Sequence, residues 1–224
     1  VAIGFALAAT YPSRAGLGGG GACLIYRPGK EGTPVPEAMV FPPPAGGPSR
    51  GDRPAAVPLM ARGLFAVSAR YGKLPIEQLI APGERFARYG VDVSRAFAAD
   101  LGAAGGALLA DPAARVVFAR ADGTPLGAGD RMVQPALGAT LAEIRVTGVG
   151  AIYQGALARR LVQASAEAGG PIDPETLRQA TPRLATPLVL RAGRDDLAFL
   201  PPPADGGLAA AVAFNVLAHQ PADV

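Results

Sequence analysis

Hydrophobic residues recur at helical spacing through the middle of the chain and form short runs nearer to its two ends. Over residues 59–71, Leu64, Val67 and Tyr71 lie three or four positions apart, which is typical of one buried helix face. Short apolar runs bounded by turn residues predict strands instead. They lie at 22–26, 38–41, 188–191 and 197–200. The pattern predicts an α/β chain whose helix-rich centre covers 59–180, with strands near both ends.

Proline, glycine and capping residues mark where the other helices begin and end. A helix that starts at Pro75 and ends at Gly90 contains Pro82, which predicts a kink or a break within it. Ser94 and Asp173 have side chains that accept hydrogen bonds from a first helical turn, so they are candidate N-caps. Further helices are expected at 1–10, 94–102, 135–144, 153–168 and 207–217, with a short one after Asp173.

Two other segments complete the expected organisation. Residues 27–58 are dense in proline and glycine, and Pro42-Pro43-Pro44 cannot lie inside a helix or a central strand. Most of this segment is therefore expected to be loop. Val116 to Ala119 form an apolar run ahead of Asp122-Gly123, which predicts one more strand and a turn.

Composition and charge argue against two classes of partner. The formal net charge is +3, but no run of arginines is longer than Arg159-Arg160, and aromatic residues are not interleaved with them as a nucleic-acid-binding face requires. We therefore expect no nucleic-acid partner. The apolar stretch Val1 to Ala9 is too short to cross a bilayer and is expected to be the remainder of a longer helix, so no membrane span is expected in this chain.

Cysteine and histidine offer little chemistry. Cys23 is the only cysteine and lies in an apolar run, so we expect a packed thiol rather than a nucleophile, a disulfide or a metal ligand. His219 is the only histidine and follows an alanine-rich helix, where a solvated helix end is expected. We therefore expect neither a metal site nor a cofactor.

The segment Gly16 to Gly21, named here the glycine loop, fits the spacing of a dinucleotide-binding fingerprint. That fingerprint needs a strand before it and a helix after it, whereas here a helix precedes and a strand follows. Successive residues without Cβ atoms instead predict a turn against which another backbone packs closely. A valine at Gly19 is therefore expected to clash and to hinder folding or processing.

Four segments, in the same order, resemble the γ-glutamyltransferase family. They are Ser13-Arg14-Ala15-Gly16-Leu17-Gly18-Gly19-Gly20-Gly21, Arg70-Tyr71-Gly72-Lys73-Leu74-Pro75, Gly129-Asp130-Arg131-Met132-Val133-Gln134-Pro135 with Tyr153-Gln154-Gly155, and Pro201-Pro202-Pro203-Ala204-Asp205-Gly206-Gly207. The family counterparts are an S-G-L-G-G-G-G loop, R-Y-G-x-L-P, G-D-x-x-x-Q-P with F-Y-x-G, and P-P-P-S-S-G-G. Each match is weak by itself, but four matches in the same order as in the family make the resemblance specific.

The resemblance implies a large-subunit portion, over residues 1–224, of a four-layer αββα N-terminal-nucleophile hydrolase sandwich completed by a small subunit. The precursor cleaves itself, and the new N-terminal threonine of the small subunit is the nucleophile, with its own α-amino group as base. No catalytic residue is then expected in this chain, and Val1 has no hydroxyl. The expected partners are that small subunit and a small-molecule amide, in the periplasm or outside the cell.

At one position the sequence differs from the family pattern that it otherwise resembles. In the family, an arginine within D-x-R-E-x-A-P of the large subunit binds the α-carboxylate of the substrate. The corresponding stretch, residues 36–44, has no arginine. Arg50 or Arg53 from the following loop are candidates for that role, although solvated loop charges are the simpler interpretation. Three functions stay open: a γ-glutamyl enzyme, an amidohydrolase for another acyl group, and a non-catalytic relative that keeps the scaffold.

Overall fold

The computed structural model describes residues 1–27, 35–46 and 55–218. Its helices are α1 (Ala2–Thr10), α2 (Pro12–Ala15), α3 (Met60–Tyr71), α4 (Ile76–Tyr89), α5 (Arg95–Leu108), α6 (Pro112–Phe118), α7 (Pro135–Thr147), α8 (Gly150–Gln154), α9 (Ala156–Glu167), α10 (Pro174–Gln179) and α11 (Asp205–Ala218). Its strands are β1 (Gly21–Ile25), β2 (Glu37–Phe41), β3 (Val91–Asp92), β4 (Arg131–Met132), β5 (Arg183–Ala185), β6 (Leu188–Ala192) and β7 (Asp195–Phe199). The expected mixture of α and β structure is therefore present.

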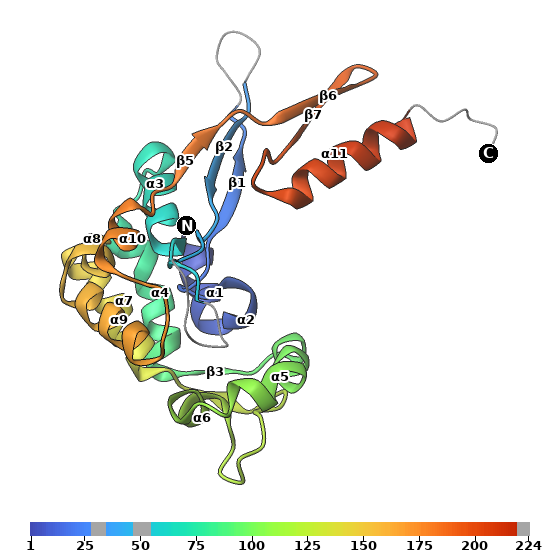
Figure 1. Cartoon of the computed structure of the whole chain (residues 1–224). Coiled ribbons are helices and arrows are strands. Elements are labelled where there is room, and N and C mark those ends of the chain that lie inside the picture. Colours follow the sequence, from blue (N-terminus) through green and yellow to red (C-terminus); the bar gives the residue numbers. More distant parts are fainter. Residues whose placement is uncertain (28–34, 47–54, 219–224) are drawn as a thin grey trace.

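A small antiparallel sheet joins segments from the two ends of the described chain. Its strand order is β1-β2-β5, and Cys23 of β1 lies opposite Met39 of β2, which in turn lies opposite Leu184 of β5. In Figure 1 this sheet lies next to α3, and α4, α7 and α9 lie on the same side of the molecule. Strand β5 was not expected, because its three residues are too short to show alternation.

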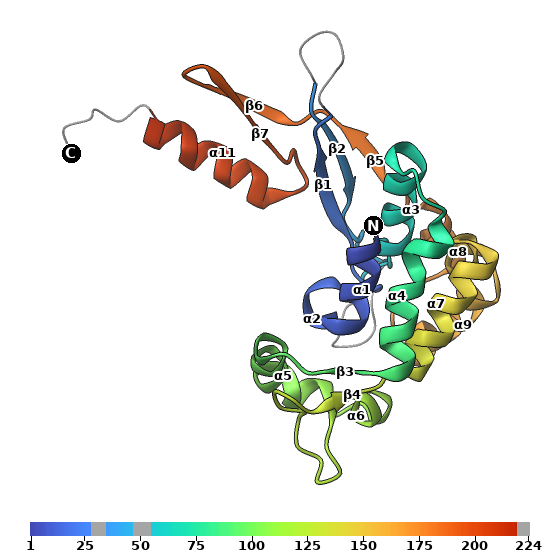
Figure 2. The ribbon, with the colours of Figure 1, turned by 180° about the vertical axis from the view of Figure 1, so that it is seen from behind.

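The main core lies where α1, α4 and α7 cross, as Figure 2 shows from behind. Phe5, Ile80, Leu141 and Ile144 are fully buried there. Gly83 of α4 lies against the backbone of α1, since a Cβ at this position would be 2.5 Å from the Phe5 carbonyl oxygen. The helices can approach so closely because Gly83 has no side chain.

Two expected helix boundaries differ in the structure. Pro82 lies inside α4 without dividing it, so the expected break is absent. The single helix expected over 153–168 is instead two, α8 and α9, because Gly155 adopts an extended backbone conformation between them.

Residues 91–134 form a separate lobe with its own small core. Val93, Phe97, Leu101, Leu126 and Met132 are buried together in it, and β3 pairs with β4 at its base. This lobe lies at the lower end of the molecule in Figure 1.

The strand expected at 116–119 is wrong, because most of these residues belong to helix α6. Asp111 accepts hydrogen bonds from the backbone N–H groups of Ala113 and Ala114, and Pro112 occupies the first helical position. This cap starts the helix and sets the conformation of the apolar run that follows it. Ala119 alone forms an isolated β-bridge, to Pro125.

The hairpin of β6 and β7 projects from the body together with α11, as Figure 1 shows. The rings of Phe199 and Phe214 join the hairpin to the helix, with centroids 6.1 Å apart. Both strands and the helix were expected from the sequence.

The glycine loop connects the sheet to the helices, and its close contact lies one residue later than expected. The Gly19 carbonyl accepts hydrogen bonds from the backbone N–H groups of Leu59 and Met60, at 2.9 and 2.8 Å, where α3 begins. At Gly20 an added Cβ would lie 2.1 Å from the Phe41 carbonyl oxygen, whereas at Gly19 the nearest atom would be 3.3 Å away. The close backbone approach is confirmed, but Gly20 rather than Gly19 is the residue that permits it.

We predict that Gly20→Ala lowers the free energy of unfolding by about 1–3 kcal/mol, because the methyl group must displace the Phe41 backbone or Pro43. Gly18→Ala is the control, since a Cβ there meets nothing within 4 Å and the change should stay within about 0.5 kcal/mol. Urea unfolding of both variants tests this. Equal effects of the two substitutions would contradict the prediction.

Candidate functional site

Strand β2 contains the stretch in which the resemblance places a carboxylate-binding arginine. Met39, Val40 and Phe41 are buried there. The Phe41 ring packs against Gly63, where an added Cβ would lie 2.2 Å from ring atoms. This end of β2 is therefore an apolar part of the core. Arg50 and Arg53 lie outside the described residues, so their candidate role stays a prediction.

A cavity of about 330 Å³ lies between the glycine loop, β2 and the proline-rich turn after β7. Gly20, Val40, Pro43 and Leu200 are among its lining residues, and none of the lining residues that the structure describes is charged. A surface of this kind favours an apolar group and offers no partner for a carboxylate.

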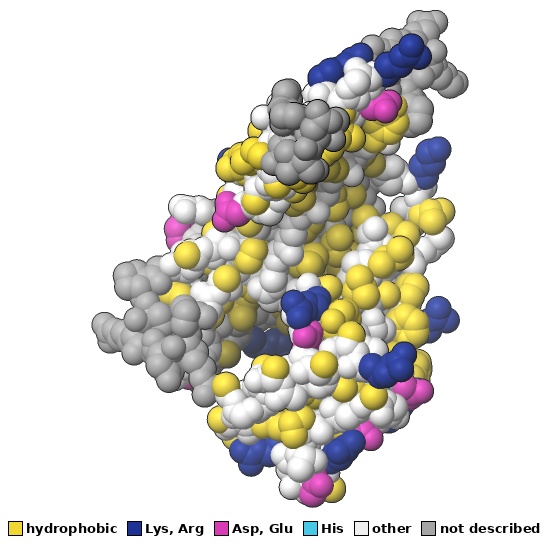
Figure 3. Space-filling view, turned by 90° about the vertical axis from the view of Figure 1, so that its right-hand side faces the viewer, with side chains coloured by type: hydrophobic (Ala, Val, Ile, Leu, Met, Phe, Trp, Pro, Cys, Tyr) yellow, Lys and Arg dark blue, Asp and Glu magenta, His cyan; other side chains and the backbone are white. Residues whose placement is uncertain are grey.

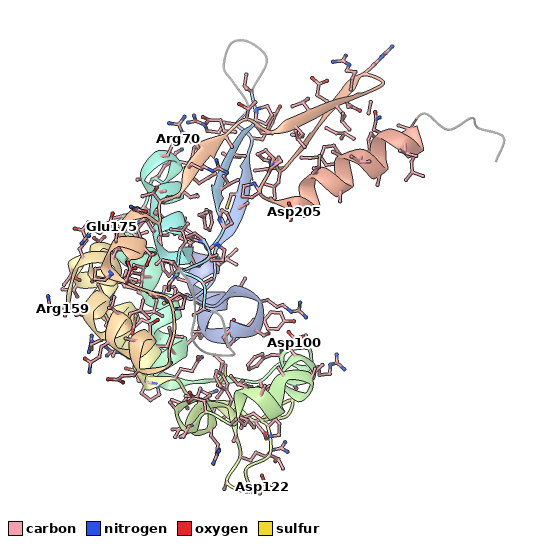
Figure 4. The ribbon with its side chains drawn as sticks, in the orientation of Figure 1. Arg70, Asp100, Asp122, Arg159, Glu175 and Asp205 are labelled. Carbon is pink, nitrogen blue, oxygen red and sulfur yellow. The ribbon has the colours of Figure 1, made fainter. Side chains whose placement is uncertain are left out.

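A charged cluster of the described residues lies at the start of β2, at the other end of the strand from this cavity. Arg70 and Tyr71 of α3 both donate hydrogen bonds to the carboxylate of Glu37 at the start of β2, the tyrosine hydroxyl at 3.0 Å. Arg27 lies 3.8 Å from the same carboxylate. The hydrogen bond from Arg70 is the main reason why the pKa of Glu37 is lowered. Arg70 thus joins α3 to the start of β2, while Arg27 follows β1; Figure 4 labels Arg70 at the end of α3.

A second ion pair fixes the lobe to the segment before the glycine loop. Arg14 donates to both carboxylate oxygens of Asp100, at 2.8 and 2.7 Å, and the Ser13 hydroxyl donates to one of them at 2.7 Å. The bonds from Arg14 and then Ser13 lower the pKa of Asp100 to about 2. Tyr11 packs edge-on against Phe97 beside this contact.

Three hydroxyl or thiol groups near the motif segments, those of Ser13, Cys23 and Tyr153, are not prepared for nucleophilic attack. Ser13 donates to Asp100, which is too weak a base at a pKa of about 2 to remove its proton. Burial raises the pKa of the Cys23 thiol and so disfavours the thiolate. Burial likewise raises the pKa of Tyr153 to about 12. The expectation that Cys23 is a packed thiol agrees with this geometry.

Two residues of the motif segments form buried structural contacts. The Gln134 side-chain amide donates to the Ala9 carbonyl at 2.6 Å and joins α1 to the start of α7. The Tyr153 hydroxyl donates to the Pro58 carbonyl at 2.9 Å, and the Arg62 guanidinium lies 3.6 Å from its ring centroid. Both side chains stabilise packing between elements that are distant in sequence.

Within the described ranges, no group of three His, Cys, Asp or Glu side chains is placed to hold a metal ion. No helix in the same ranges is both long and apolar enough to cross a membrane.

The comparisons with known proteins decide the family. The profile described as Gamma-glutamyltranspeptidase matches residues 1–223. The chain belongs to the γ-glutamyltranspeptidase family. The family resemblance of the four motif segments is therefore confirmed.

Individual members of the family agree with this assignment. The chain is 28% identical to a glutathione hydrolase proenzyme of Escherichia coli (strain K12) over 97% of its own length and 40% of that protein. It is 29% identical over 167 residues to the acylase ACY 1 proenzyme of Pseudomonas sp. (strain SE83), covering 75% of this chain and 30% of that one. The chain therefore spans less than half the length of these curated relatives.

A solved structure shows that the fold is shared as well. The crystal structure of Helicobacter pylori γ-glutamyltranspeptidase superimposes with a TM-score of 0.87 at 26% identity, covering 99% of this chain and 68% of that one. The expected fold class is thus confirmed: the chain forms part of an N-terminal-nucleophile hydrolase sandwich. The division of residues 1–224 into a single large-subunit portion stays a prediction.

The contacts of Glu37 and Asp100 are the part of this region that sequence reasoning missed. Arg70 and Tyr71 belong to one motif segment, and Ser13 and Arg14 to another, so the motifs marked one partner of each contact. Nothing in the sequence indicated the other partner, because Glu37 and Asp100 lie 33 and 86 positions away from the arginines.

Asp100→Asn is predicted to lower the melting temperature at neutral pH, because a charged partner of Arg14 is lost. The folded-state pKa of Asp100 lies below that of an unfolded aspartate, near 4, so its carboxylate stabilises the fold above about pH 4. That contribution disappears as the pH falls towards about 2. The melting-temperature difference between variant and parent should therefore shrink over this window.

Asp92→Asn is the control for this measurement, since it removes a more exposed ion pair, with Arg131. If the melting-temperature difference from the parent changed with pH equally in both variants, the pH dependence would not come from the contact of Asp100 with Arg14.

Proposed function

We propose that this family member is the large-subunit portion of an amide hydrolase or acyl transferase whose nucleophilic threonine lies on a second, self-cleaved chain. The threonine hydroxyl attacks the amide carbonyl, its own α-amino group takes the proton, and the amine leaves with that proton. The acyl group is then transferred from the threonine to water or to another amine. In this scheme the described chain supplies the scaffold and one wall of the site.

The observation that carries the proposal is the uncovered apolar face of α11. Leu208, Val212 and Val216 recur every four residues along this helix and are 44%, 56% and 54% exposed. Figure 3 looks at the side from which α11 and the hairpin project, and hydrophobic side chains are spread over it. A helix face of this kind is normally covered by another element.

Two further observations support the second chain. Ser13, Cys23 and Tyr153 are not activated as nucleophiles, although relatives are named hydrolases and acylases. Several of these relatives are also named proenzymes, which fits a precursor that is cleaved. By the same resemblance we propose a periplasmic or extracellular location.

Intact-mass analysis of the purified protein is predicted to reveal a second chain that begins with threonine or serine. Val212→Asp should weaken its association by placing a charge on the apolar face of α11. Val116→Asp is the matched control, because Val116 is 85% exposed on α6 in the lobe. A single stable, folded chain of this size would refute the proposal.

For the substrate, we propose an amide whose acyl group lacks the free amino-acid head of a γ-glutamyl group. Among the described residues, the buried end of β2 and the cavity beside it present no cationic side chain to an α-carboxylate. Arg27 and Arg70 lie against Glu37, at the opposite end of β2 from this cavity. The similarity to an acylase proenzyme supports this class.

We predict a higher kcat/KM for pentanoyl para-nitroanilide than for γ-glutamyl para-nitroanilide, assayed on the complete processed protein. Loss of a buried carboxylate–arginine pair commonly costs about 2–5 kcal/mol, or roughly thirty- to several-thousand-fold in specificity. The two substrates share a leaving group, so their ratio reports the acyl group alone.

Efficient hydrolysis of glutathione would contradict the substrate proposal. Arg50→Ala and Arg53→Ala would then show which arginine binds the carboxylate. An intact second chain with no turnover of either anilide would favour the non-catalytic relative.

A further inference from the structure

A second and larger pocket lies between α9 and α10, at the opposite side of the molecule from α11. Its volume is about 490 Å³, which is within the range of small-molecule sites. Figures 1 and 2 both place α9 and α10 far from the projecting hairpin and helix. The pocket is therefore separate from the face that we assign to the second chain and from the cavity beside the glycine loop.

The inner wall of this pocket is apolar and rigidly held. Tyr153, Ala158, Val162 and Pro174 contribute to it. Tyr153 is only 1% exposed, its hydroxyl is bonded to the Pro58 carbonyl, and the Arg62 guanidinium stacks on its ring. The tyrosine therefore closes the inner end of the pocket, and Val162 and Pro174 contribute more exposed apolar surface.

The polar part of the pocket is cationic. Arg159 and Arg178 line it, and none of its lining residues that the structure describes is an aspartate or glutamate. Arg159 is exposed and forms no ion pair with any residue that the structure describes. Figure 4 shows Arg159 at the outer side of α9, with Glu175 on the neighbouring α10.

Arg178 is partly neutralised but keeps donors for a ligand. One of its nitrogens is bonded to Glu175, whose other carboxylate oxygen accepts from Gln179 at 2.7 Å. A guanidinium has five N–H donors, so one such bond leaves others available. The pocket thus combines an apolar wall with an unpaired cation and a second guanidinium.

We propose that this pocket binds a small organic anion with an apolar body and one carboxylate, sulfonate or phosphate group. The apolar body lies against Val162 and Pro174, and the anionic group is bound by Arg159 with Arg178 beside it. A neutral molecule of the same shape makes the apolar contacts but no ionic interaction with the arginines. A cation of that shape is repelled by them. This binding does not depend on the proposed catalytic activity.

The test uses anilinonaphthalene sulfonate as the anionic probe and N-phenylnaphthylamine as its neutral counterpart, titrated by fluorescence into the full protein. Arg159→Gln should weaken sulfonate binding about tenfold, the usual effect of losing one charge-assisted contact. Arg159→Glu should weaken it further. Neither substitution should change binding of the neutral probe by more than about twofold.

Arg160→Gln is the matched control, because Arg160 is the next residue of α9, is also exposed, pairs with Glu143 and does not line the pocket. It should leave sulfonate binding unchanged, and Val162→Phe, which fills the pocket, should weaken both probes. Equal losses from Arg159→Gln and Arg160→Gln would overturn the proposal by showing attraction to net charge alone. Unchanged sulfonate binding in Arg159→Gln would overturn it directly.

Discussion

The glycine loop is the constraint on which the arrangement of sheet and helices depends. Its Gly19 carbonyl caps the start of α3, and its Gly20 backbone lies against the Phe41 carbonyl at the end of β2. Phe41 in turn packs against Gly63 of α3. Gly20 and Gly63 on either side of one aromatic strand residue thus let the sheet layer and the helix layer lie closer together than side chains normally permit.

The motif segments that identify the family serve mainly as structural contacts in this chain. Arg70 and Tyr71 hold the Glu37 carboxylate, Gln134 bonds to α1, and Tyr153 bonds to the segment before α3. Such side chains join elements that are distant in sequence, which is where a fold needs directional bonds. A match to these motifs consequently indicates the scaffold, and says less about which acyl group the site accepts.

Much of the fold was predictable because helix periodicity and punctuation are local signals. Ser94 and Asp173 do cap helices, and the strands at 22–26 and 38–41 form as β1 and β2. The expected strand at 116–119 was wrong because the local apolar pattern was not the strongest signal. The Asp111 cap starts helix α6, and most of the apolar run belongs to that helix. The candidate site was less predictable, since its ion pairs and cavities join residues from remote segments.

The lobe of residues 91–134 leaves the body and returns to it at nearly the same place. Its first and last strands, β3 and β4, pair with each other, and the flanking helices α4 and α7 pack together, with Glu84 bonded to Arg145 at 2.7 Å. The lobe is therefore a topological insertion with its own small core. A change in the length of its outer turn, at Asp122-Gly123, would therefore leave the packing of α4 on α7 in place.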